Sequence, residues 1–249
     1  MRRHAYLLAP EPDAPFPPAS AALRQPEGLL AYGGDLSPTR LLNAYAGGIF
    51  PWYSAGQPIL WWSPDPRMVF DTDRVHLATR FRRQLRRSRW QVRADSDFAA
   101  VLAACAGIPR PGQDGTWITP EMRQAYLRLH RLGHAHSVEV YDPELGLVGG
   151  IYGVALGRMF FGESMFSTVS GGSKVALAAL ARYLAGRGCP LLDAQVENPH
   201  LLSLGARHMP RDAFLEQVRE LAAQPGLVGP WTADFGVLEA RTLAAGAAL

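Results

Sequence analysis

A run of strand and helix patterns between residues 136 and 196 constrains the fold of this chain more than any other feature. Four stretches have the apolar and β-branched composition of strands: residues 136–141, 147–156, 158–161 and 191–196. Gly157 marks a turn between the second and third stretches, and residues 173–185 form a strongly apolar helical pattern that ends at Gly186. A β-hairpin followed by a helix and a further strand predicts an α+β sheet domain.

Three polar side chains interrupt the apolar sequence of this region: Glu163, Asp193 and Gln195. Glu163 is expected at the end of a strand. Asp193 and Gln195 are two residues apart on a predicted strand, so both are expected to point to the same face. Because a buried carboxylate is costly unless it is paired or used, the three residues predict a pocket that binds a polar group and is suited to acid–base chemistry.

The N-terminal part of the chain has its own helix and a segment rich in tryptophan. Ser37 is a natural N-cap and Pro38 suits the first helical position, so a helix is predicted from there to Gly47. Three tryptophans follow within eleven residues: Trp52, Trp61 and Trp62. Their spacing favours packing between domains over stacking on a nucleic-acid base.

A second domain is predicted to begin at residue 67. Thr119 and Pro120 mark the start of one of its helices. Further short strands and helices are expected at residues 68–70, 76–88, 90–93, 97–106 and 120–132. We therefore expect a small N-terminal domain, residues 1–66, and a larger domain, residues 67–249.

The formal net charge is only +3, but one segment of the chain is strongly basic. Its seven arginines are Arg80, Arg82, Arg83, Arg86, Arg87, Arg89 and Arg93. On a helix they would form a basic face able to neutralise phosphates. An ordinary solvated helix surface explains the same arginines equally well, so a phosphate-bearing partner follows only if another feature calls for one.

Composition limits the class of protein further. The two cysteines, Cys105 and Cys189, form no spaced framework, which favours a reducing compartment. The longest uncharged apolar stretch, residues 145–157, is too short to span a bilayer. The histidines are too scattered to form a metal site. We therefore expect a cytoplasmic protein that uses no membrane, metal or cofactor.

Several long motif blocks make the sequence more specific. They lie in order at residues 28–38, 48–53, 59–67, 115–119, 132–140, 148–155, 161–167 and 193–206. Together they resemble the leucyl/phenylalanyl-tRNA–protein transferase family over roughly residues 14–215. Ala194, Tyr141 and Gly172 depart from the family pattern, which commonly has cysteine, tryptophan and alanine there. None of these departures removes a chemical group that the activity needs.

The resemblance implies a fold, an activity and partners. The implied fold is a small N-terminal domain joined to a C-terminal mixed-sheet domain of the N-acetyltransferase (GNAT) type with flanking helices. The implied activity moves leucine or phenylalanine, and less readily methionine, from tRNA to the N-terminal arginine or lysine of an acceptor protein, which marks it for N-degron degradation. Leucyl-tRNA, phenylalanyl-tRNA and such acceptor proteins are the expected partners of a monomer without a cofactor.

The implied reaction is aminolysis of an ester, in which the acceptor's own α-amine is the nucleophile. That amine has a pKa of roughly 7.7–8.0, so no serine or cysteine nucleophile is required. We expect Gln195 to contact the attacking amine or the ester carbonyl while Asp193 polarises and orients it. A hydrogen-bonded pair that only holds the strand, and a proton route through the tRNA ribose hydroxyl, both stay open. Glu163 is expected to bind a positively charged amine, with a structural buried carboxylate as the alternative.

The resemblance also assigns residues to substrate binding. An apolar pocket for leucine or phenylalanine would include Ile151, Phe160, Met165, Leu177, Leu180 and Leu192, although the spacing of the last residues suits any core. Asn198 belongs to the same motif region. Trp52 and Trp117 stand where the family stacks the terminal adenosine, which reverses the preference for simple packing at Trp52. The tRNA phosphates would contact Arg80, Arg82, Arg83, Arg86 and Arg87.

Two rival functions fit parts of the sequence. An acyl-coenzyme A-dependent N-acyltransferase would suit the order of strands and helices, but residues 168–173 lack the glycine spacing with which that class holds a pyrophosphate. A non-catalytic RNA-binding protein would use the arginines and tryptophans. It would leave Glu163, Asp193 and Gln195 without a purpose.

Overall fold

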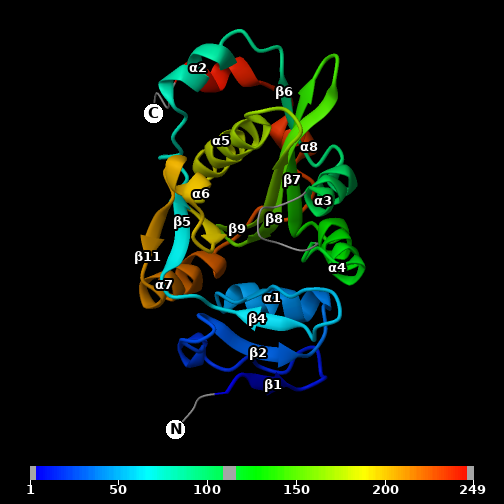
Figure 1. Ribbon diagram of the computed structural model, residues 1–249, viewed down its shortest axis with the longest axis vertical. Coiled ribbons are helices and arrows are strands. Elements are labelled where there is room, and N and C mark those ends of the chain that lie inside the picture. Colours follow the sequence, from blue (N-terminus) through cyan, green and yellow to red (C-terminus); the bar gives the residue numbers. More distant parts are fainter. Residues whose placement is uncertain (1–3, 109–115, 246–249) are drawn as a thin grey trace.

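Two β-sheets organise the part of the chain that the computed structural model describes, residues 4–108 and 116–245 (Figure 1). The first sheet has the order β1-β2-β4-β3, with β1 parallel to β2 and the other pairs antiparallel. Its strands are β1 (Tyr6–Leu8), β2 (Leu29–Gly33), β3 (Phe50–Pro51) and β4 (Leu60–Trp62). Helix α1 (Pro38–Ala46) lies between this sheet and the rest of the molecule (Figure 1).

The second sheet has eight strands in the order β11-β5-β10-β9-β8-β7-β6-β12. They are β5 (Arg67–Asp71), β6 (Gln91–Ala94), β7 (Ala135–Asp142), β8 (Gly146–Leu156), β9 (Met159–Ser167), β10 (Leu191–Gln195), β11 (Arg207–Met209) and β12 (Leu238–Glu239). The sheet is mixed, because β9 and β10 run parallel while the other described pairs are antiparallel. The predicted α+β fold with a mixed sheet and flanking helices is therefore confirmed.

Helices cover both faces of the large sheet. They are α2 (Thr79–Leu85), α3 (Phe98–Gly107), α4 (Pro120–Arg131), α5 (Gly172–Ala185), α6 (Pro199–Ser203), α7 (Arg211–Ala222) and α8 (Thr232–Phe235), with short 3-10 turns at Ala19–Ala21 and Ala240–Ala245. Helix α5 makes the crossover from β9 to β10 and packs on one face, whereas α3 and α4 pack on the other (Figure 1). Within the described residues, no helix has the length and apolar character needed to cross a membrane.

The helix starts follow from local sequence. The Ser37 hydroxyl accepts the N–H of Arg40 at 3.2 Å, and the Thr119 hydroxyl accepts the N–H of Met122 at 3.3 Å. A proline occupies the first turn of both helices. These contacts satisfy backbone donors that have no partner within the helix, so the predicted starts of α1 and α4 are confirmed.

Two predicted elements differ from the structure by three or more residues at an end, whereas the others differ by about one residue. Helix α2 spans residues 79–85 rather than 76–88, and Phe81 packs against Gly171 before the first turn of α5. Strand β9 continues to Ser167 instead of ending at residue 161, because β8 pairs with it along its whole length. Glu163 therefore lies within a strand rather than at the end of one. The domain boundary at residues 66 and 67 stays a prediction.

Candidate active site

A cavity of about 500 Å³ opens where the two parallel strands part. Strands β9 and β10 pair from Met159 with Leu191 as far as Phe161 with Asp193. Beyond that point β9 follows β8 and β10 stays with β5, and residues 162–167 and 194–196 line the cavity between them. Ligand sites commonly lie beyond the carboxyl ends of parallel strands, where the backbone diverges in this way.

Glu163 of β9 is a buried carboxyl group in the wall of this cavity. Its Oε1 accepts hydrogen bonds from Gln195 Nε2 and from the Tyr45 hydroxyl, both at 2.8 Å. Its Oε2 accepts one from the Tyr126 hydroxyl at 2.6 Å. Burial raises the pKa of Glu163 to about 7 against the lowering effect of these donors, and the negative charge of Asp193 adds to the rise. The carboxyl group therefore titrates close to neutral pH.

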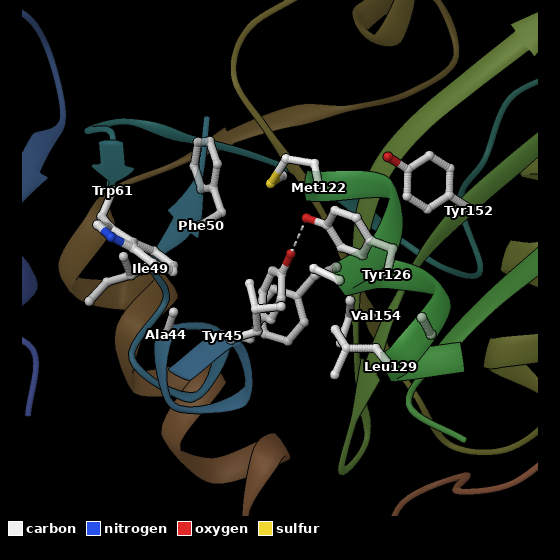
Figure 2. Packing of buried hydrophobic residues seen from close by; sticks show 14 of the residues in the cluster. Ala44, Tyr45, Ile49, Phe50, Trp61, Met122, Tyr126, Leu129, Tyr152 and Val154 are labelled. Carbon is white, nitrogen blue, oxygen red and sulfur yellow. Dashed lines mark hydrogen bonds between the residues drawn. The ribbon is translucent and has the colours of Figure 1, made fainter. Parts of the chain in front are cut away.

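The two tyrosines come from helices that are distant in sequence. Figure 2 shows Tyr45 of α1 and Tyr126 of α4 directing their hydroxyl groups toward one another, with 2.8 Å between the oxygens. Burial, followed by the charge of Glu163, raises the pKa of both phenols well above 10, so both stay protonated. Sequence reasoning assigned neither tyrosine to the site. A tyrosine on the buried face of a helix was the available signal, because its hydroxyl requires a partner there.

Asp193 has a different environment from the one predicted. Its carboxylate is fully buried and forms a two-pronged ion pair with Arg67 of β5, with Nε–Oδ1 at 2.8 Å and Nη2–Oδ2 at 2.7 Å. Asp193 does not belong to the cavity lining, and it contacts Gln195 through the backbone N–H, at 2.8 Å from Oδ1, rather than through the side chain. Sequence reasoning missed Arg67, whose only signal was its place in a motif block.

The path of β10 also differs from a regular strand. Its pairing with β5 shifts between Asp193 and Gln195, so one extra residue forms a β-bulge there. Gln195 has a φ of +63°, which is uncommon for a residue with a side chain. The expected alternation of side chains therefore breaks at this point, and the bulge helps to aim the Gln195 amide at Glu163.

The structure brings most of the predicted substrate-binding residues to the cavity. Those in its wall are Trp52, Trp117, Ile151, Met165, Leu177, Leu192 and, at an exposed position, Asn198. Phe160 and Leu180 are not among the lining residues. The Phe160 ring instead fills the space beside Gly153 and packs on Trp231, and Leu180 is a buried core residue one turn further along α5. The sequence missed several other lining residues, including Phe50, Ile108, Phe166, His200 and Leu201.

The predicted basic segment lies beside this cavity. Four of the five proposed tRNA-binding arginines are exposed and Arg82 is half-buried. None of the five takes part in an ion pair of the described residues, whereas the neighbouring Arg89 pairs with Glu144. The Phe81 ring of α2 lies 5.7 Å from Lys174 Nζ, so α2 adjoins the first turn of α5, where Ser173 lines the cavity.

The fold and the cavity define an α+β protein with a largely apolar ligand site and a buried carboxyl group that titrates near neutral pH, an arrangement typical of enzyme active sites. The chain belongs to the leucyl/phenylalanyl-tRNA protein transferase family. The model of that family matches residues 69–219, and the model of the family's N-terminal domain matches residues 34–65. The resemblance drawn from the motif blocks is thus confirmed.

Individual relatives agree with the family models. A leucyl/phenylalanyl-tRNA–protein transferase of Xanthomonas axonopodis pv. citri (strain 306) is 66% identical over 98% of each chain. One from Xanthomonas euvesicatoria pv. vesicatoria (strain 85-10) is 70% identical over 94% of this chain and 93% of its own. A solved structure of a functionally unknown conserved protein from Staphylococcus epidermidis ATCC 12228 aligns over 73% of this chain and 68% of its own, with 12% identity. Its TM-score of 0.40 supports no conclusion about fold.

Proposed function

We propose that this protein transfers leucine or phenylalanine, and less readily methionine, from aminoacyl-tRNA to the N-terminal arginine or lysine of acceptor proteins. The product then enters N-degron degradation. One observation carries the proposal: in a member of this family, an apolar cavity wide enough for such a side chain runs up to the hydrogen-bonded pair of Glu163 and Gln195. The chain has only two cysteines, Cys105 and Cys189, and both are buried in the core. This sparse use of cysteine supports a reducing cytoplasm as its location, where it acts as a monomer.

The reaction needs a neutral amine and a protonated leaving group. The nitrogen of the acceptor's α-amine attacks the ester carbonyl carbon, a C–N bond forms, and the C–O bond to the tRNA ribose breaks. A proton leaves the amine and one reaches the ribose oxygen, so no oxidant, reductant or cofactor is consumed. The protein must orient the amine and give the proton a route.

Glu163 is suited to handling the amine proton. In its ionised form it binds an ammonium group, and in its neutral form it holds the proton that the ammonium releases. Its pKa of about 7 lies close to that of an α-amine, roughly 7.7–8.0. A difference of about one pKa unit corresponds to about 1.4 kcal/mol, so the proton can move in either direction at little cost. The tRNA ribose hydroxyl is a second route for the same proton.

Gln195 and the cavity wall position the reactants. The Gln195 side chain donates to Glu163, and its amide oxygen can accept a hydrogen from the attacking amine. Trp52 and Trp117 offer flat faces for the terminal adenosine, and Met165 offers an adaptable wall for differently shaped side chains. The exposed arginines in α2 and just after it are available for tRNA phosphates.

We also assign the large sheet, within a domain of residues 67–249, to the N-acetyltransferase type. The parting of the parallel strands β9 and β10 around the cavity supports this assignment. An acyl-coenzyme A substrate is disfavoured by the first turn of α5, because two amides that could hold a pyrophosphate are already used. The Gly172 N–H donates to the Val169 carbonyl at 3.0 Å, and the Ser173 N–H donates to Ser167 Oγ at 2.8 Å.

A direct transfer assay tests the proposed function. The protein is incubated with leucyl-tRNA and a peptide that begins with arginine, and mass spectrometry should detect the peptide with one leucine added. A peptide that begins with an acidic residue should gain nothing. Failure of both peptides to react, together with acetylation of the first from acetyl-coenzyme A, would identify an N-acyltransferase instead.

A pair of matched variants connects the activity to the site. Glu163→Gln removes the titrating carboxyl and should lower kcat by about 10²–10⁴-fold, the usual size of an acid–base contribution. Glu139→Gln is its control, because Glu139 is also a buried carboxyl with a pKa raised by burial but is outside the cavity lining. Equal losses in both variants would place Glu163 among structural carboxyl groups.

A further inference from the structure

A buried ion pair contacts the active-site residue Gln195 but does not itself line the cavity. Arg67 and Asp193 are both completely buried, and neither is among the cavity-lining residues. Their two parallel hydrogen bonds, 2.8 and 2.7 Å long, fix the plane of the carboxylate. Gln195, which does line the cavity, donates its backbone N–H to that same carboxylate.

The arginine is itself held from several directions. Its Nη1 donates to the Gly48 carbonyl at 3.0 Å. The guanidinium carbon lies 4.7 Å from the centre of the Phe50 ring and 4.5 Å from that of Phe214. These contacts come from the N-terminal segment and from α7, so Arg67 joins both of them to β10.

The residue at the end of this chain of contacts has a conformation that requires support. Gln195 has a left-handed φ of +63° in a β-bulge, and side-chain-bearing residues keep such a conformation only where the surroundings impose it. The Asp193 Oδ1 contact to the Gln195 N–H, at 2.8 Å, is such a constraint. Without it the bulge could relax, and the Gln195 amide would no longer be held 2.8 Å from Glu163.

We propose that Arg67 is a positioning residue for the transfer reaction, which acts by orienting the Asp193 carboxylate so that it holds Gln195 in its left-handed conformation. In this arrangement the geometry of Asp193 matters, and its charge serves to retain Arg67 rather than to polarise Gln195. The inference rests on the proposed function, since the reaction is what Gln195 is positioned for.

A double-substitution cycle separates geometry from charge. Arg67→Gln alone leaves a buried carboxylate without its cation, and Asp193→Asn alone leaves a buried guanidinium without its anion. Each should lower kcat by about 100-fold or more, with the KM for leucyl-tRNA changed by less than about threefold. The double variant R67Q/D193N replaces the ion pair with two amides that can bond to each other and to the Gln195 N–H. Its kcat should be at least about tenfold higher than that of either single variant.

Hydrogen exchange gives a readout that does not depend on activity. Exchange measured by mass spectrometry on a peptide that covers residues 191–198 should speed up at least about tenfold in R67Q, while a peptide that covers β9 keeps its protection. The double variant should restore most of the protection. This result would support the positioning role even if the transfer assay with the wild-type protein failed, so the two proposals fail separately.

Other results would overturn the inference. A double variant as inactive as D193N but with full protection of residues 191–198 would show that the negative charge of Asp193 is needed. Full kcat in a folded R67Q protein would show that Arg67 is dispensable for the reaction. Unchanged exchange of residues 191–198 in R67Q would show that Arg67 does not hold the bulge.

Discussion

The hydroxyl oxygens of Tyr45 and Tyr126 lie 2.8 Å apart, although each hydroxyl is also within hydrogen-bond distance of a carboxyl oxygen of Glu163. Three contacts join these side chains in a ring, and the two phenols supply only two hydrogens. With Glu163 ionised, one contact therefore has no hydrogen. With Glu163 neutral, its own proton completes all three. The two phenols lower the pKa of Glu163 because they donate to its ionised form, but burial outweighs them and raises that pKa to about 7.

The first prediction concerns stability as a function of pH. The pKa of Glu163 is about 7 in the folded protein against 4.5 for an ordinary glutamate, so the folded state holds its proton more tightly. The contribution of Glu163 to the free energy of unfolding is fully present below about pH 4.5 and is lost as the pH rises toward 7. The difference in unfolding free energy between wild type and E163Q should change by about 3 kcal/mol over that range. Urea titrations at several pH values measure it, and a flat difference would contradict the raised pKa.

The second prediction concerns the tyrosine donors. Tyr45→Phe and Tyr126→Phe each remove a hydrogen bond that lowers the pKa of Glu163, so each should raise that pKa. The acidic limb of the kcat/KM profile for transfer should therefore move to higher pH, and the protein should become less stable by about 1–3 kcal/mol. Tyr183→Phe is the control, because it removes a similarly bonded hydroxyl that donates to Asp234 outside the cavity lining. If the acidic limb of the kcat/KM profile stays at the same pH in both test variants, the tyrosine hydroxyls do not influence the pKa of Glu163.

Local signals in the sequence predicted much of the fold. The caps at Ser37 and Thr119 depend on groups three residues away, so the sequence shows them directly. The ion pair of Arg67 with Asp193 spans 126 residues and the Tyr45–Tyr126 contact spans 81, and no local pattern indicates such partners. The bulge at Gln195 was missed for a different reason: an alternating pattern does not show where a strand has one residue too many.

In the candidate site, too, some residues could be predicted from the sequence, whereas others depend on contacts that the sequence does not show. The motif blocks indicated Glu163 and Gln195, which do lie 2.8 Å apart, and several cavity-wall residues. Phe160 was expected to line the cavity because the family resemblance implied it. It turns into the core instead, where Gly153 leaves space for its ring, and only the register of β8 against β9 reveals that fit.

The third prediction concerns the aromatic residues of the cavity wall. Trp52→Ala and Trp117→Ala should each raise the KM for leucyl-tRNA by about 5–150-fold, since stacking on a base contributes about 1–3 kcal/mol. kcat at saturating tRNA should change little. Trp90→Ala is the matched control, because Trp90 is also half-buried but bonds Asp142 away from the cavity. Steady-state kinetics with varied leucyl-tRNA make the comparison, and an unchanged KM in both test variants would exclude stacking by these residues.

The fourth prediction concerns side-chain selectivity. Met165→Ala enlarges the cavity and should reduce discrimination against isoleucine, because the β-branched side chain gains room. Phe160→Ala, which alters the core instead of the lining, should cost about 3–5 kcal/mol of stability while leaving selectivity unchanged. Competition between leucyl- and isoleucyl-tRNA for one acceptor peptide measures both variants. If F160A relaxed selectivity and M165A did not, the assignment of the wall would be wrong.

The fifth prediction concerns the basic segment formed by α2 and the residues just after it. Arg83 in α2 and Arg87 beyond its end are exposed and take no part in the ion pairs of the described residues, so their charges are available to phosphates. Replacing both by glutamine should weaken leucyl-tRNA binding most at low salt. The magnitude of the slope of the logarithm of the binding constant against the logarithm of the salt concentration should also fall. The fall should be about one for each phosphate that the two residues no longer neutralise. Arg187→Gln is the control, because Arg187 is paired with Asp234. Binding titrations between low and high salt give the slopes. Identical slopes for the wild type and the double variant would show that Arg83 and Arg87 lie away from the tRNA backbone.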